Sequence, residues 1–269
     1  MKDYVLELAS RQSGFNAKLN IMREYLQAYI LRIMHDEGVF RSIAFLGGTA
    51  LRFLYGLPRF SEDLGFSIIR KADYPFVELI KKVKKELVLS GYNVSVIYGE
   101  EKTVQNAFIK FEGLMYEAGL SPLKSQKFSI KIEIDTNPPA GAILQTYIVN
   151  KYFLLSFSSY DLPSLFAGKI NALLSRKYTK GRDFFDLGWY LSKWKDISPN
   201  LVLLANSLKQ TGRKNRVPSV KNWKKLIYNI VKEVEWKKVR QDVENFLENP
   251  RDLEILTQDN ILRLLKPRD

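Results

Sequence analysis

Hydrophobic residues follow a helical spacing near the N-terminus and a strand-like pattern further along the chain. Residues 17–37 place apolar side chains three or four positions apart, which predicts one apolar helix face. A second helix is predicted from about 75 to 89, and Gly91 follows it as a suitable stop. Runs rich in β-branched and aromatic residues predict strands of a mixed sheet at 42–46, 64–69, 92–98, 107–111, 128–135 and 147–157.

The pattern becomes helical from Leu162 to the end. Helices are predicted roughly at 162–177, 182–193, 198–210, 219–231, 235–247 and 257–265, separated by Gly, Pro and Asn. The sequence therefore predicts an α/β mixed-sheet domain over residues 1–158, followed by an all-α helical domain over residues 159–269.

Composition narrows the chemistry. With no cysteine and one histidine, thiolate sites and most zinc sites are excluded, so a metal would be held by carboxylates, which suit Mg²⁺ or Mn²⁺. No stretch approaches the roughly 20 apolar residues of a membrane span, and we expect a soluble, cytoplasmic protein with no membrane partner.

The charge also points to a partner. The formal net charge is +13, and residues 151–269 hold 23 Lys and Arg against 13 Asp and Glu. Such an excess favours polyanions such as RNA, although a lysine-rich proteome produces the same excess.

The first motif joins a glycine turn to a carboxylate. Gly47, Gly48 and Thr49 follow a predicted strand and open a helix, where backbone N–H groups can bind the phosphates of an NTP. Period-2 alternation in the next strand places Asp63 and Gly65 on one side of that strand, with Asp63 facing the turn. A purely conformational turn and a capping aspartate would explain the same residues.

Two later motifs add charges. In KIEID, Lys131, Glu133 and Asp135 share the polar face of a strand, where they are either metal ligands with a neighbouring ammonium or ordinary solvated charges. In KINALLSRKYTKGRDFFDL, Lys169 and Arg176 recur at helical spacing. Asp183 and Asp186 lie three positions apart near the start of a new helix, which is also the pattern of a cap with a surface ion pair.

Three segments together, FLGGTALRFLYGLPRFSEDLGFS, KIEID and KINALLSRKYTKGRDFFDL, resemble the AbiEii/AbiGii-type abortive-infection toxins and their MenT-type relatives over roughly residues 40–190. The resemblance implies a polymerase-beta-like nucleotidyltransferase that uses an NTP and Mg²⁺ or Mn²⁺. Members act in toxin–antitoxin pairs, and some extend the 3′ end of tRNA, so an antitoxin and RNA are expected partners.

The resemblance also assigns residues. It implies that Gly48 and Thr49, beside Gly47, form the nucleotide turn, that Asp63 is the first metal ligand, and that Lys169 binds phosphate. Arg176 is expected at the nucleotide and Asp183 as the later essential aspartate. Glu133 and Asp135 are expected to complete the metal site.

One position departs from the pattern. The family's D-x-D reads Asp63-Leu64-Gly65, so the second carboxylate is absent. A catalytically weakened or inactive module that binds a nucleotide or RNA is therefore an alternative to the enzyme. Phosphoryl transfer to a protein or small-molecule hydroxyl is a third interpretation.

A basic segment between residues 209 and 225 is a candidate nucleic-acid surface. It contains Lys209, Arg213, Lys214 and Arg216 without an acidic residue, and Trp223 could stack on a base. A solvated basic face with Trp223 in the core is the alternative.

Overall fold

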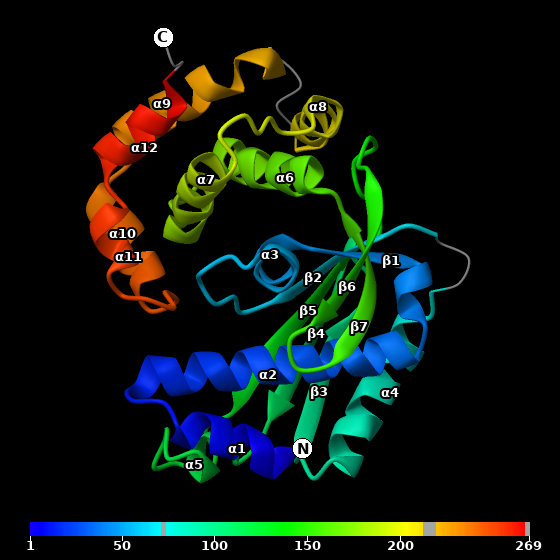
Figure 1. The fold of residues 1–269 in the computed structure, drawn as a ribbon. Coiled ribbons are helices and arrows are strands. Elements are labelled where there is room, and N and C mark those ends of the chain that lie inside the picture. The colour runs from blue at the N-terminus through cyan, green and yellow to red at the C-terminus, as the bar shows by residue number, and fades with distance from the viewer. Residues whose placement is uncertain (71–73, 212–218, 267–269) are drawn as a thin grey trace. The chain divides into compact units, whose positions relative to one another are not determined.

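The computed structural model describes residues 1–70, 74–211 and 219–266. Its contacts divide the chain into two compact units, each with its own core (Figure 1). The sheet unit comprises Met1–Gly56, Phe60–Pro138 and Gln145–Ser159, and the helical unit comprises Leu57–Arg59, Pro139–Leu144 and Tyr160–Asp269. Two short segments of the predicted first domain, Leu57–Arg59 and Pro139–Leu144, group with the helical unit, and the boundary near residue 158 stays a prediction.

In the described part of the chain, the strands form one seven-stranded sheet in the order β3-β4-β5-β2-β1-β7-β6. The strands are β1 Ile43–Leu46, β2 Leu64–Ile68, β3 Val94–Gly99, β4 Val104–Phe111, β5 Phe128–Asp135, β6 Leu144–Asn150 and β7 Leu154–Tyr160. Strand β1 is antiparallel to β2 and parallel to β7, while β2 is parallel to β5. The predicted mixed sheet is thus confirmed.

The helices of the sheet unit are α1 Lys2–Ser10, α2 Phe15–Asp36, α3 Gly47–Tyr55, α4 Phe76–Leu89 and α5 Leu114–Glu117, with a short 3-10 turn at Val39–Arg41. Residues of α1, α2 and α4 share one buried cluster with the sheet, and Figure 1 shows these helices beside it. The helix α1 was not predicted from the sequence, and its two fully covered side chains are Val5 and Ala9.

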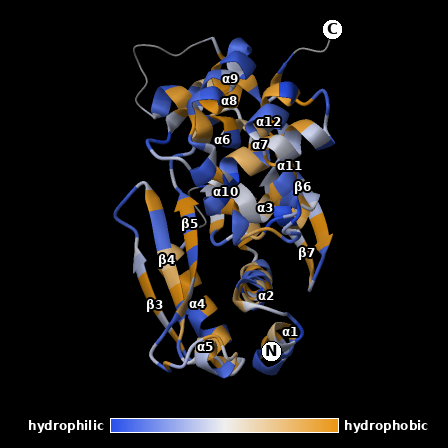
Figure 2. Ribbon diagram, turned by 90° about the vertical axis from the view of Figure 1, so that its left-hand side faces the viewer, coloured by the Kyte–Doolittle hydropathy of each residue, from blue (hydrophilic) through white to orange (hydrophobic). Residues whose placement is uncertain are grey.

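Alternation along the central strands separates an apolar face from a polar one. Phe45, Phe66 and Ile134 are almost completely buried and pair across β1, β2 and β5. The intervening positions, Gly65 and Glu133, also pair with each other and therefore lie on the opposite face. Figure 2 shows hydrophobic and hydrophilic residues interspersed along β3, β4 and β5.

The single strand predicted over 147–157 was wrong: the structure has two strands, β6 and β7, with a turn at 151–153. This turn is fixed by contacts with α2. Lys151 Nζ lies 2.9 Å from Glu24 Oε2, and the Tyr152 hydroxyl donates to Glu24 Oε1 at 2.9 Å. The turn depends on contacts with a residue far away in the sequence, so the local alternation of apolar and polar residues does not predict it.

The helical unit contains α6 Leu162–Ser175, α7 Gly181–Lys193, α8 Leu201–Gln210, α9 Trp223–Glu233, α10 Trp236–Glu244, α11 Asp252–Ile255 and α12 Gln258–Leu265. Asp161 caps α6 by accepting a hydrogen bond from the backbone N–H of Ser164 at 2.9 Å. The all-α character predicted for the second half is confirmed for its described residues. Among the described residues, no helix is both long enough and apolar enough to cross a membrane.

Aromatic rings form the centre of this unit. The rings of Phe166 and Tyr190 stack with centroids 4.4 Å apart, and Trp223 packs edge-on against Phe166 at 5.3 Å. Trp223 is only 4% exposed. The suggestion that it stacks on a base is therefore wrong, because its ring is already enclosed by the core.

Candidate functional site

The glycine turn connects β1 to α3. Gly47 has a φ of 86°, a left-handed conformation that favours glycine, and it begins α3 directly after the last residue of β1. The hydroxyl of Thr49 donates to the backbone carbonyl of Asp63 with an O···O distance of 2.5 Å. The structure thus brings the turn and the Asp63 backbone together at one end of the β1–β2 pair.

The carboxylates of β5 lie on the polar face of the same sheet. Glu133 pairs with Gly65 in parallel register, and Asp135 pairs with Ser67. Glu133 forms an ion pair with Lys131, and Asp135 Oδ1 accepts from the backbone N–H of Asn137 at 2.9 Å. If Glu133 and Asp135 also bound a cation, these contacts would have to break, or the carboxylate oxygens would have to bind both partners.

Among the residues that the structure describes, no three Asp, Glu or His side chains gather closely enough to hold a metal by themselves. A protein Mg²⁺ site commonly uses only one or two carboxylates, with water and substrate phosphates as the other ligands. The metal roles of Asp63, Glu133 and Asp135 stay predictions.

The sequence did not predict a buried polar cluster between α2 and α3, the helix that follows the glycine turn. Glu24 of α2 forms an ion pair with Arg52 of α3, and both side chains are at most 4% exposed. Lys151 and Tyr152 also bind this carboxylate. Burial acts to raise the pKa of Glu24, but Arg52 and Lys151 outweigh it and hold the pKa below its ordinary value.

The same cluster holds the segment that leads to Asp63. The Arg52 guanidinium lies 4.0 Å from the centroid of the Phe60 ring, and the Gln27 amide donates to the Ser61 carbonyl at 3.0 Å. With the Thr49 contact, these interactions fix the backbone on the approach to Asp63. No sequence motif predicts these contacts, because Glu24 and Gln27 lie on a helix whose pattern predicts only an apolar face.

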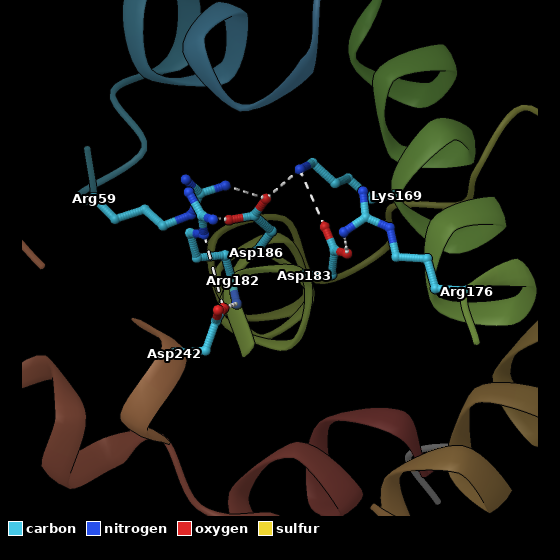
Figure 3. A network of polar contacts seen from close by, with 7 residues as sticks. All are labelled: Arg59, Lys169, Arg176, Arg182, Asp183, Asp186 and Asp242. Atoms are coloured by element: carbon cyan, nitrogen blue, oxygen red, sulfur yellow. Dashed lines mark hydrogen bonds and ion pairs between the residues drawn. The ribbon is translucent and has the colours of Figure 1, made fainter. Parts of the chain in front are cut away.

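In the helical unit, Lys169 lies between the two aspartates of α7 (Figure 3). Its Nζ is 2.6 Å from Asp186 Oδ2 and 3.5 Å from Asp183 Oδ1. The side chain of Lys169 is 14% exposed, against 4% for Asp183 and 0% for Asp186. The spacing of the two aspartates thus does place them on one face, as predicted, with the lysine across it.

Each aspartate has a further cationic partner. Arg59 binds Asp186 with Nε and Nη2, and Arg176 Nη1 is 2.8 Å from Asp183 Oδ2 (Figure 3). Burial acts to raise the pKa of Asp186, yet Arg59 and Lys169 together hold it below its ordinary value. Asp186 is therefore a buried carboxylate kept ionised by two cations.

Arg59 was not assigned a role from the sequence. It lies in the segment that joins α3 to β2, yet it belongs to the helical unit. Leu247 pairs with it in an isolated antiparallel bridge, and the N–H of Glu248 donates to the carbonyl of Pro58 at 3.3 Å. The feature of the sequence that could have indicated a role for Arg59 is its place in the motif PRFSEDLGFS, four residues before Asp63.

The predicted site residues thus form two groups, each inside one unit. Gly47, Gly48, Thr49, Asp63, Glu133 and Asp135 are in the sheet unit, and Lys169, Arg176 and Asp183 are in the helical unit. Their convergence on one nucleotide stays a prediction. Of the basic segment, Lys209 is exposed at the end of α8, while Arg213, Lys214 and Arg216 lie outside the described residues.

One solved structure supports the fold, and a second is also similar to the chain. The chain is similar to a Helicobacter pylori protein described as "putative nucleotidyltransferase", at 18% identity and a TM-score of 0.50, covering 93% of this chain and 98% of that one. It is also similar to JHP933 from Helicobacter pylori, at 20% identity and a TM-score of 0.44, covering 90% of this chain and 91% of that one. No curated protein sequence matches the chain.

A family match extends over most of the sequence. The family described as "Nucleotidyl transferase AbiEii toxin, Type IV TA system" matches residues 29–259. This range contains both the turn and carboxylates of the sheet unit and the lysine–aspartate network of the helical unit. The chain therefore belongs to the AbiEii family of nucleotidyltransferase toxins.

Proposed function

We propose that this protein transfers a nucleoside monophosphate from an NTP to a hydroxyl of RNA, with a tRNA 3′ end as the first acceptor to test. It would act in the cytoplasm as the toxin of a pair with a cognate antitoxin. The observation that carries the proposal is the hydrogen bond from Thr49 to the Asp63 carbonyl, which joins a phosphate-binding type of turn to the carboxylate-bearing residue directly before β2.

In this proposal the sheet unit holds the triphosphate. Gly47, Gly48 and Thr49 present backbone N–H groups at the N-terminus of α3, where an anion is favoured. Asp63, with Glu133 or Asp135, would hold Mg²⁺ or Mn²⁺ together with phosphate oxygens. When bound, the ion neutralises charge on the oxygens of the reacting phosphate.

The helical unit would supply the cations. Lys169 is oriented by Asp186 at 2.6 Å and contacts Asp183 more loosely at 3.5 Å, so its ammonium can turn toward a phosphate without losing its main partner. Asp183 would position Lys169 and Arg176 together. The acceptor oxygen bonds to the α-phosphorus as the bond to pyrophosphate breaks, and the hydroxyl proton is released.

A second candidate function is a module that binds a nucleotide or RNA without turning it over. Gly65 occupies the position of the second family carboxylate, and it pairs with Glu133, whose charge is balanced by Lys131. A site with one carboxylate fewer and one neutralised would bind a second ion weakly. This candidate predicts binding without transfer.

The test is incubation of the protein with total RNA and Mg²⁺ or Mn²⁺, using each NTP labelled at either the α- or the γ-phosphate. Nucleotidyl transfer moves the α-label to RNA, whereas phosphoryl transfer moves only the γ-label. Asp63→Ala and Lys169→Met should abolish labelling, and the exposed Asp36→Ala serves as control. Equal labelling by wild type and Asp63→Ala would refute the assigned site. Absence of labelling with every NTP would favour the binding module.

A further inference from the structure

A cavity of about 230 Å³ lies beside Asp183 in the helical unit. The end of α6, the loop at 176–180, the start of α7 and the end of α9 surround it. One part of its wall is apolar, formed by Ala172, Leu173, Phe184, Ile230 and Val234. The other part is cationic, with Arg176, Lys177 and Lys180.

The two lysines are not neutralised by the network next to them. Asp183 is on the wall, but its carboxylate is already shared by Arg176 and Lys169. Among the described residues, neither Lys177 nor Lys180 has an acidic side chain within ion-pair distance. Glu233 is the other acidic residue of the wall. The cavity therefore combines an apolar surface with positive charge available to a ligand.

The electrostatics of Lys180 agree with an anionic ligand. Burial lowers the pKa of Lys180, and the nearby Arg182 and Arg176 lower it further, while Asp183 opposes them. A bound phosphate would offset the repulsion among these cations.

An aromatic ring completes the wall. Tyr178 is 68% exposed, and the Arg176 guanidinium lies 5.9 Å from the centroid of its ring. Exposed tyrosines beside cations are a recurring feature of sites for single-stranded nucleic acids, in which the ring stacks on a base and the cations bind the backbone.

We propose that this cavity binds one nucleotide of the acceptor RNA strand, with its phosphate at Lys177 and Lys180 and its base against Tyr178. The inference rests on the proposed function for the identity of the acceptor. The exposed ring favours a strand over a free NTP, because a strand passes along a surface and offers bases and phosphates in alternation.

The experiment measures binding without turnover. Fluorescence anisotropy of a labelled single-stranded oligoribonucleotide is followed in EDTA, without NTP, across a salt titration. Lys177→Gln and Lys180→Gln should each weaken binding several-fold and reduce the salt slope by about 0.7, the value for one phosphate contact on a single strand. Tyr178→Ala should weaken binding about fivefold or more through loss of stacking.

Two further variants distinguish binding at the cavity from a general effect of positive charge. Lys195→Gln removes the same charge from an exposed loop of the same unit and should leave affinity nearly unchanged. Ala172→Leu places extra carbon atoms on the cavity wall without altering charge, and it should weaken binding with no loss of thermal stability.

Unchanged affinity and salt slope in the Lys177→Gln/Lys180→Gln double variant would overturn the inference. It would also be overturned if these variants lost binding of free NTP while retaining that of the oligoribonucleotide. An inactive protein whose RNA binding depends on these residues would refute the proposed transfer but support the cavity. If the protein transferred nucleotides to RNA but RNA binding did not depend on these residues, the proposed transfer would be supported and the cavity assignment refuted.

Discussion

Arg59 and Asp186 are joined by two parallel hydrogen bonds across 127 positions of sequence. Arg59 Nε lies 2.6 Å from Asp186 Oδ1, and Arg59 Nη2 lies 2.6 Å from Oδ2. The two side chains are 3% and 0% exposed. Within the helical unit, Leu57–Arg59 is thereby attached to α7 at a residue three positions from Asp183.

This buried pair predicts a large loss of stability when one partner is removed. Asp186→Asn or Arg59→Gln should lower the free energy of unfolding by about 3–5 kcal/mol, since each change breaks a buried, doubly hydrogen-bonded ion pair and leaves the charge of the other partner buried with less compensation. Urea denaturation measures the loss. The control is Arg11→Gln, whose exposed pair with Glu7 should contribute about 0–1 kcal/mol. Similar losses in the buried and exposed variants would contradict the prediction.

The depressed pKa of Asp186 predicts a specific pH dependence. Its pKa in the folded protein is below the unfolded value of about 3.9, so its contribution is complete above that value and is lost as pH falls through the folded pKa. The stability difference between wild type and Asp186→Asn should therefore be constant near neutral pH and narrow below about pH 4. Urea denaturation at several pH values tests this, and a difference that widened on acidification would be inconsistent with it.

The position of Gly65 predicts that a second carboxylate can be accommodated. A Cβ there would lie 3.4 Å from Leu46 Cδ1 and from the Leu46 carbonyl oxygen, an ordinary contact, on the face that carries Glu133. Gly65→Asp should fold and increase transfer, with a gain that depends on Mg²⁺ or Mn²⁺ concentration because the added carboxylate repels Asp63 unless metal is bound. Turnover across a metal titration is the measurement.

Gly65→Asn is the matched control, since it has the same shape without the charge. If Asp and Asn at this position gave equal turnover, the missing carboxylate would have no bearing on activity. A gain absent from both variants would favour the binding module or a site rebuilt on Glu133 and Asp135.

Two glycines of the helical unit predict opposite responses to alanine. A Cβ on Gly181 would lie 1.9 Å from the carbonyl oxygen of Val239, so Gly181→Ala must displace α10 and should destabilise by about 1–3 kcal/mol or more. Gly168, inside α6, has nothing within 4 Å of an added Cβ. Gly168→Ala should therefore stabilise by about 0.5–1 kcal/mol. Thermal unfolding of the two variants side by side decides whether close packing, and not backbone conformation alone, selects Gly181.

The sequence determined most of the order of elements, and it predicts which residues carry the chemistry. Alternation and helical spacing are local properties, so they predicted the mixed sheet, α2, α4 and the helices of the second half except the short α11. Gly47 lies at the turn predicted after the first strand. Gly65 pairs with Glu133, and both lie on the polar face that alternation predicts for their strands. Three motifs in the correct order identified the family.

Only the tertiary structure decided which charges meet. Glu24 and Arg52 are 28 positions apart, and Arg59 and Asp186 are 127 apart, so no local pattern selects these partners. The turn between β6 and β7 and the enclosure of Trp223 depend in the same way on packing against distant elements. The cavity beside Asp183 exists because three helices enclose the loop at 176–180. Desolvation and ion pairing depend on distances in space, which the hydrophobic pattern of a single segment does not specify.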